Sequence, residues 1–206
     1  MTKIFIEAKS ANTSEYYFLK TIIDVYFPGK DVQFIFMNGI GNLYSETIRN
    51  QIHLAQESGE QAIVLADADT IAKGFGYAKR KQAIYKGMAT HTLFFPYFLY
   101  PNNQDDGDVE VLMESAARRD LHQVFFDCFE DYERCVSGAK NGSGEPKYNV
   151  PNLKGKLHTY MSAQKLPRKW SKRFGSGDWL FDDKDYWDLD AAALQPLKAF
   201  LAEHLQ

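Results

Sequence analysis

The chain has 206 residues, of which 45% are hydrophobic, 15% aromatic and 25% charged, and its formal net charge is −3. This composition argues against a disordered chain and suffices for one domain with a full core, alone or with a sizeable appendage. No apolar run reaches the roughly 18–20 residues of a membrane-spanning helix, and the charged start excludes a signal peptide. We therefore expect a cytoplasmic protein with no membrane partner.

Apolar runs predict strands and helices in alternation along the first two thirds of the chain. Strands are predicted over 2–7, 31–37, 61–66 and 91–100, and Pro96 favours either an edge position or a bulge for the last of them. The first helix is predicted after Asn12, which would cap it together with Glu15 three residues on. Further helices are predicted after Ser45, over 77–88, from Val109 and over 124–136. This alternation predicts an α/β fold with a largely parallel sheet of about four strands flanked by helices.

The last third of the chain follows a different pattern. A Gly-rich and Pro-containing segment over 138–152 predicts a loop between an α/β core at 1–137 and an extension at 153–206 that packs on the core. We expect the extension to be poor in helices until a final helix near Pro196. Cys128 and Cys135 share one face of a predicted helix too far apart for a disulfide, and we interpret both as reduced core residues.

Charge is unevenly distributed in this extension. Positive residues without an acidic one occupy 154–173, and an acidic block follows at 178–190. The two blocks are either an anion-binding surface next to an acidic segment that balances its charge, or two solvated faces that pair with each other. Aromatic residues interleave the basic stretch, either as a stacking platform for bases or as a small aromatic core: Tyr160, Trp170, Phe174 and Trp179.

Three carboxylates follow two predicted strands of this sheet. Glu7 ends the first strand, and Asp67 and Asp69 end the third. Because ligands of parallel α/β sheets lie beyond the carboxyl ends of the strands, these residues should meet at one edge. Such oxygen ligands suit Mg²⁺ or Mn²⁺ better than zinc. The alternative, that an aspartate only caps the next helix, explains one of the two but neither the second nor Glu7.

The segments Ile4-Phe5-Ile6-Glu7-Ala8 and Ile63-Val64-Leu65-Ala66-Asp67-Ala68-Asp69-Thr70 resemble the Toprim signature of topoisomerases, DnaG-type primases and OLD-family nucleases. The resemblance covers about residues 2 to 115 and implies a Toprim-like, Rossmann-like fold. It implies that Glu7 is the catalytic general acid/base or a metal ligand and that Asp67 and Asp69 bind Mg²⁺. Ala8 departs from the usual glycine. The whole chain is also similar to a group of bacterial Toprim-like proteins for which the resemblance implies a fold and no established activity.

A second acidic group, Asp105, Asp106, Asp108 and Glu110, follows the fourth predicted strand. The start of a helix explains Asp108 and Glu110, but it does not explain Asp105 and Asp106. The resemblance to OLD-like nucleases implies a second metal position here, with Asp106, Asp108 and Glu110 as ligands. Two metal ions would stabilise the attacking and leaving oxygens of a phosphodiester displacement.

Basic residues near these motifs are candidates for holding phosphate or nucleic acid: Lys9, Lys73, Lys79 and Arg80. The last three also fit the solvated face of a surface helix. Gly39-Ile40-Gly41 lacks the third glycine of a dinucleotide fingerprint, since Tyr44 stands there, and no Walker A loop is present.

Two functions follow as expectations. The first is a Mg²⁺-dependent, nuclease-like enzyme that acts on the phosphodiesters of nucleic acid. The second is a non-catalytic Toprim-fold binding or regulatory module for another protein, such as a separately encoded ATPase. The two acidic groups favour the first, whereas Ala8 and the lack of a long uniformly basic surface favour the second.

Overall fold

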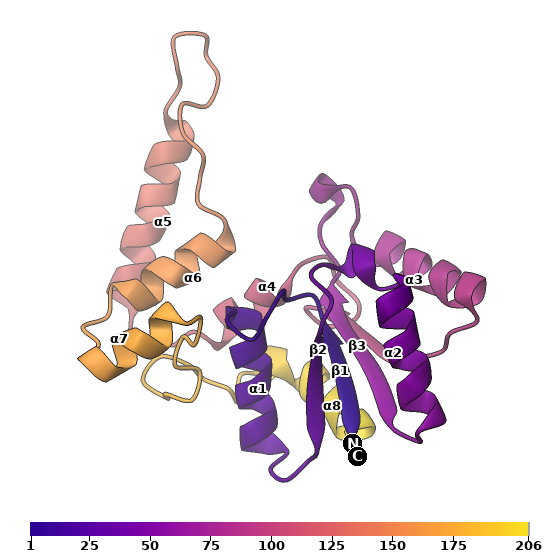
Figure 1. Ribbon diagram of the computed structural model, residues 1–206. Coiled ribbons are helices and arrows are strands. Elements are labelled where there is room, and N and C mark those ends of the chain that lie inside the picture. The colour runs from indigo at the N-terminus through magenta and orange to yellow at the C-terminus, as the bar shows by residue number, and fades with distance from the viewer. Residues whose placement is uncertain (206) are drawn as a thin grey trace.

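A computed structural model describes residues 1–205 as an α/β fold around one four-stranded sheet (Figure 1). The strands are β1 (Thr2–Ile6), β2 (Val32–Phe36), β3 (Gln61–Asp67) and β4 (Tyr97–Tyr100), in the order β2-β1-β3-β4. All three pairings are parallel, with Ile6 aligned to Phe36 on one side and to Leu65 on the other. The predicted parallel sheet is thus confirmed, and β4 occupies an edge, one of the two alternatives that Pro96 favoured. This sheet is consistent with the Toprim resemblance without confirming it.

Helices cover both faces of the sheet because its central strands are apolar on both sides. In β1, Ile4 and Ile6 face one hydrophobic core and Phe5 faces the other. The first core includes α1 (Ser14–Tyr26), α4 (Val109–Ala116) and α8 (Gln195–His204). The second includes α2 (Glu46–Glu57) and α3 (Tyr77–His91). Short 3₁₀ turns lie at Ile40–Asn42 (η1), Ile71–Lys73 (η2) and Ala192–Leu194 (η3).

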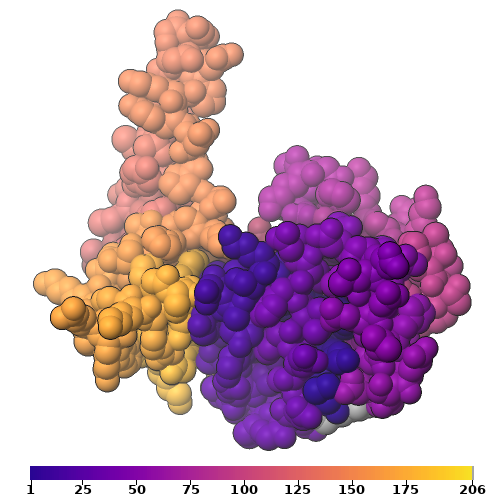
Figure 2. All heavy atoms as spheres, viewed as in Figure 1, coloured from indigo at the N-terminus to yellow at the C-terminus, as the bar shows by residue number. Residues whose placement is uncertain are grey.

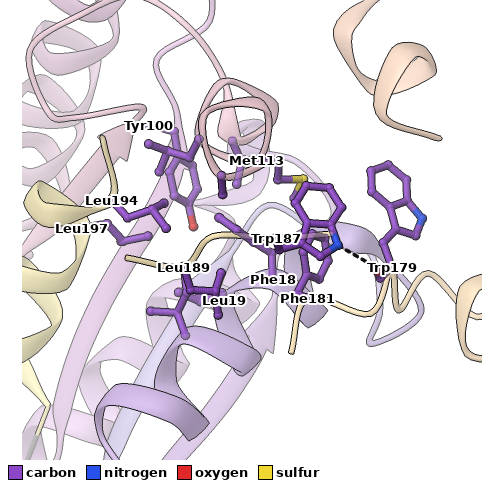
Figure 3. Packing of buried hydrophobic residues seen from close by; sticks show 14 of the residues in the cluster. Phe18, Leu19, Tyr100, Met113, Trp179, Phe181, Trp187, Leu189, Leu194 and Leu197 are labelled. Carbon is purple, nitrogen blue, oxygen red and sulfur yellow. Dashed lines mark hydrogen bonds between the residues drawn. The ribbon is translucent and has the colours of Figure 1, made fainter. Parts of the chain in front are cut away.

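The C-terminal region joins the first core through aromatic side chains. Phe181 packs against Phe18 of α1 with ring centroids 5.1 Å apart, and the buried Trp187 donates its indole N–H to the Trp179 carbonyl at 2.8 Å (Figure 3). Tyr160 and Trp179 are also buried. The aromatic-core interpretation therefore holds for these two residues. The division at 137 and 152 itself stays a prediction.

One long helix leaves the body of the molecule. The helix α5 (Gln123–Gly138) and the segment 139–152 that follows it rise away from the sheet, and the chain returns into α6 (Leu153–Ser162) and α7 (Arg168–Gly175) (Figures 1 and 2). Cys128 and Cys135 are free but exposed. Their prediction as core residues was wrong because both side chains lie on an exposed part of the α5 surface.

Three other expectations need correction. The fourth strand begins at Tyr97 rather than at 91, because α3 continues to His91 and ends where Thr92 adopts a left-handed conformation with φ 51°. The first helix is capped by Thr13, whose hydroxyl accepts the Tyr16 N–H, rather than by Asn12. The basic stretch contains α6 and α7 instead of being helix-poor.

The two charge blocks pair in part, since Arg173 forms ion pairs with Asp178 at 2.6 Å and Asp182 at 2.7 Å. No helix within residues 1–205 is long and apolar enough to cross a membrane.

Contact between α3 and the residues preceding α2 depends on a glycine. A Cβ atom at Gly87 would lie 2.1 Å from the Tyr44 ring, whose hydroxyl donates to the Ile84 carbonyl at 2.7 Å. Gly87→Ala should therefore lower the free energy of unfolding by about 1–3 kcal/mol through overpacking, measured by urea denaturation. Gly138→Ala is the matched control, because nothing lies within 4 Å of its added Cβ. Equal stability of both variants would show that Tyr44 moves aside freely.

Candidate acidic site at the carboxyl edge of the sheet

Glu7 ties together the carboxyl ends of neighbouring strands. One of its carboxylate oxygens accepts the Asp67 N–H at 2.8 Å and the other accepts the Ile40 N–H at 3.2 Å. Burial raises the pKa of Glu7, and these two hydrogen bonds oppose the rise. The structure thus brings the first predicted site residue directly against the third strand, as the parallel register requires.

Asp67 ends β3 and reaches toward the start of α4. Its carboxylate accepts the Val109 N–H at 2.9 Å. Burial, followed by the nearby carboxylates of Glu7, Glu110 and Glu15, raises the pKa of Asp67 to about 9. Asp67 therefore holds a proton at neutral pH when no cation is present.

Glu15 belongs to the same acidic group, although the sequence pattern indicated only a helix-capping role for it. It stands in the first turn of α1, and its Oε1 is buried without a hydrogen-bond partner. Burial and the charges of Glu7 and Glu110 raise the pKa of Glu15 to about 8. An unpartnered buried carboxyl oxygen is costly, so it points to a missing proton donor or cation.

Glu110 and Lys154 form an ion pair across the site. Glu110 lies in the first turn of α4 and is 7% exposed, and its carboxylate is 2.9 Å from the Lys154 ammonium group. Burial lowers the pKa of Lys154, but the charges of Glu110, Glu15 and Asp67 outweigh it and raise that pKa overall. Lys154 comes from the start of α6, so the C-terminal extension supplies one side of the site.

Asp69 and Asp108 are linked by a shared lysine. Asp69 adopts φ 59°, and its carboxylate pairs with Arg80 and with Lys73 at 3.4 Å. Lys73 also reaches the Asp108 carboxylate at 3.4 Å, while the other Asp108 oxygen, Oδ1, is buried without a partner. Asp69 is thus already neutralised by two cations, whereas Asp108 keeps one free oxygen.

The remaining predicted residues lie apart from this group. Asp106 accepts the Tyr77 N–H at 2.7 Å at the start of α3, close against Gly76. Lys79 donates to the Gly74 carbonyl at 3.4 Å. Lys9 is exposed and forms no ion pair with any residue in 1–205. None of the three contributes to the cleft described next.

A cleft of about 300 Å³ gathers these side chains, and its ionisable lining residues are Glu15, Asp67, Lys73, Asp108, Glu110 and Lys154. Across residues 1–205, no group of three or more His, Cys, Asp or Glu side chains is arranged to hold a metal ion. The donor chemistry nevertheless fits a hard cation, because carboxylates from β3, α1 and α4 converge and two buried oxygens lack partners.

Comparisons with known proteins identify a family. The chain matches no curated protein and no solved structure. The sequence model of the family described as "Protein of unknown function (DUF3226)" matches residues 13–206, which include Glu15, Asp67, Glu110 and Lys154. The chain therefore belongs to the DUF3226 family.

Proposed function

We propose that this protein is a Mg²⁺- or Mn²⁺-dependent, Toprim-like protein that hydrolyses phosphodiester bonds of nucleic acid. The observation that carries the proposal is the cleft lined by Glu15, Asp67 and Glu110, where the carboxylate oxygens Glu15 Oε1 and Asp108 Oδ1 are buried without hydrogen-bond partners. Clustered carboxylates repel one another unless they share protons or a cation. A divalent cation would relieve that repulsion.

Asp67, Asp108, Glu110 and Glu15 are the residues that would hold the cation. Their oxygens are currently shared with backbone N–H groups, Lys73 and Lys154, so binding requires those ammonium groups to give way. Asp69 and Asp106, which the sequence placed among the ligands, would first have to leave Arg80 and the start of α3. When bound, a divalent cation polarises the phosphate and lowers the pKa of water.

The chain's own residues supply the rest of the reaction. Burial raises the pKa of Glu7, which makes its carboxylate a better acceptor for the proton of an attacking water molecule. Lys73 and Lys154 both line the cleft, where they would offset the negative charge of phosphate oxygens.

The first test is metal binding. Millimolar Mg²⁺ or Mn²⁺ should raise the melting temperature, because the cation binds only the folded state. Asp67→Asn combined with Asp69→Asn should abolish the rise, whereas Asp127→Asn with Asp131→Asn on exposed α5 should keep it. If Mg²⁺ and Mn²⁺ leave the wild-type melting curve unchanged, the cleft is not a divalent-cation site.

The second test is cleavage. Purified protein should degrade DNA or RNA with Mg²⁺ or Mn²⁺ and not with a chelator. Absence of both cleavage and salt-sensitive binding on single-stranded, duplex and RNA substrates would refute the nuclease function.

A second candidate is a binding or regulatory module that partners another protein, such as an ATPase. The apolar face of α5 favours it, since Val124 is 78% exposed and borders a groove of about 510 Å³ formed with Phe129, Tyr132 and Pro151. Exposed apolar grooves of this kind commonly mark protein interfaces. A folded protein that neither binds divalent cation nor cleaves any substrate would favour this candidate over the enzyme.

A further inference from the structure

The strand β4 forms one edge of the sheet, and its outer side has no neighbouring strand. On the inner side the Pro96 carbonyl accepts the Val64 N–H, and the parallel register then turns every second residue of β4 toward β3. Tyr97 and Leu99 therefore direct their backbone N–H and C=O groups away from the sheet. Such outward groups are a template for pairing with another extended chain.

Asn103 closes one end of this edge and leaves the other end open. Its N–H donates to the Leu99 carbonyl at 2.8 Å, and its side-chain oxygen accepts the Leu99 N–H at 3.1 Å. Both outward groups of Leu99 are thus satisfied. Within residues 1–205, the backbone N–H and C=O of Tyr97 have no hydrogen-bond partner. A strand that docks here must pair at Tyr97 rather than along the whole edge.

A groove of about 600 Å³ borders the open part of the edge. Helices on opposite faces of the sheet form its two walls. Tyr85 of α3 packs against Tyr97 with ring centroids 5.9 Å apart, and Phe200 of α8 packs against Phe98 with centroids 5.5 Å apart. Phe94 also lines the groove and is 74% exposed. The unpaired backbone of β4 therefore lies between two apolar walls.

The charge of the groove is negative. Glu203 is the one acidic residue among those that line it, and neither Lys nor Arg is present there. The Glu203 side chain is 74% exposed, and its carboxylate lies 3.8 Å from the His204 ring. A carboxylate beside exposed aromatic side chains is complementary to a segment that carries a basic residue next to apolar ones.

We infer that this groove binds an extended segment of a partner protein, which adds to the sheet as a fifth strand by pairing with the backbone of Tyr97. Successive side chains of an added strand point to opposite faces of the sheet, so apolar residues would contact Tyr85 on one wall and Phe200 on the other. A Lys or Arg of the segment would pair with Glu203.

The β4 strand of a second copy is a poorer match for the groove. Its own edge is enclosed by the same two helices, so α3 and α8 of the two copies would meet before their strands could pair. No residue that lines this groove lines the acidic cleft, and the groove is also separate from the one on α5. The inference therefore does not depend on the proposed function.

Selection from a library of random peptides of about ten residues, with the wild-type protein in chelator as bait, supplies the probe. Selected peptides should combine adjacent large apolar residues with a Lys or Arg. Amide hydrogen exchange measured by NMR should show that the bound peptide protects the Tyr97 N–H, while the Val64 N–H, already paired within the sheet, changes little. N-methylation of the central peptide amides should abolish binding, because the side chains remain but the hydrogen-bond donors are lost.

Variants of the groove give a second measurement. Tyr85→Ala combined with Phe94→Ala should weaken peptide binding about tenfold or more. Tyr148→Ala combined with Ile71→Ala is the matched control, because it removes a tyrosine and an apolar residue of similar exposure outside the groove, and it should change affinity by about twofold at most. Glu203→Gln should weaken binding and reduce its salt dependence.

The inference is overturned if no peptide is selected whose binding the Tyr85 and Phe94 variant weakens, or if the bound peptide leaves exchange of the Tyr97 N–H unchanged. Protection of that N–H without peptide, rising with protein concentration together with a doubled mass in sedimentation, would assign the groove to a second copy and overturn the partner. Peptide binding by a protein that cleaves no phosphodiester would refute the catalytic function and support the inference.

Discussion

Asp67→Asn is expected to stabilise the metal-free protein by about 2–4 kcal/mol at pH 8. The folded carboxyl keeps its proton up to a pKa of about 9, whereas the ordinary value is 3.8. Between these pH values the folded state binds more protons than the unfolded state, so its stability falls as the pH rises. Asparagine cannot ionise, and its side-chain oxygen can still accept the Val109 N–H. The substitution removes the penalty while keeping that hydrogen bond.

The pH profile gives this prediction its sharpest form. Urea denaturation in chelator should show wild-type stability decreasing from about pH 4 toward pH 9, with Glu15 contributing up to its pKa of about 8. Asp67→Asn should flatten the decline, and Asp127→Asn on the exposed face of α5 should follow the wild type. If Asp67→Asn is the less stable protein at every pH, the carboxyl is not held protonated in a buried acidic group.

Glu7→Gln is expected to lower metal-dependent phosphodiester cleavage by about a hundredfold or more while leaving the fold intact. Glutamine can still accept one of the two backbone N–H bonds from Asp67 and Ile40, but it cannot take a proton from water. Lys154→Met should also lower cleavage, by about tenfold to a hundredfold, because it removes a cation from the cleft and leaves the buried Glu110 unpaired.

Single-turnover rates with an oligonucleotide substrate measure both effects, and melting curves verify folding. Lys165→Met removes an exposed lysine outside the cleft and serves as the control for Lys154→Met. Cleavage by Glu7→Gln at the wild-type rate would exclude Glu7 as the proton acceptor, even if the metal requirement remained.

Local patterns were sufficient to predict the sheet and to place two acidic strand ends at one edge. Continuous apolar runs define β1 and β3, and the parallel order then requires Glu7 and Asp67 to meet. The start of β4 was predicted too early because the apolar residues before Tyr97 favour a strand, whereas Leu93 and Phe95 pack in the same core as Met88 of α3. Helical spacing correctly placed Cys128 and Cys135 on one helix. It gave no information on whether another element of the fold covers them.

Which residues line the cleft depends on tertiary contacts, and the spacing of residues along the sequence does not predict these contacts. Glu15 fits a helix-capping pattern, and only the packing of α1 beside β1 and α4 buries its carboxyl. Lys154 lies far along the chain in a basic block, and its pairing with Glu110 depends on where α6 begins. Asp69 had the expected position, but its partner Arg80 could not be identified from sequence because Lys79 and Lys81 are adjacent alternatives.

Calorimetric titration with Mn²⁺ at pH 7.5, repeated in buffers of different ionisation enthalpy, tests the central claim most directly. If the acidic cleft binds the cation, wild-type protein should bind Mn²⁺ and release protons, because Asp67 and Glu15 must lose theirs to become ligands. Asp67→Asn should bind much more weakly and release fewer protons. Saturable binding that is unchanged in Asp67→Asn, or no binding by the wild type at millimolar Mn²⁺, would contradict the assignment of the cleft as a metal site.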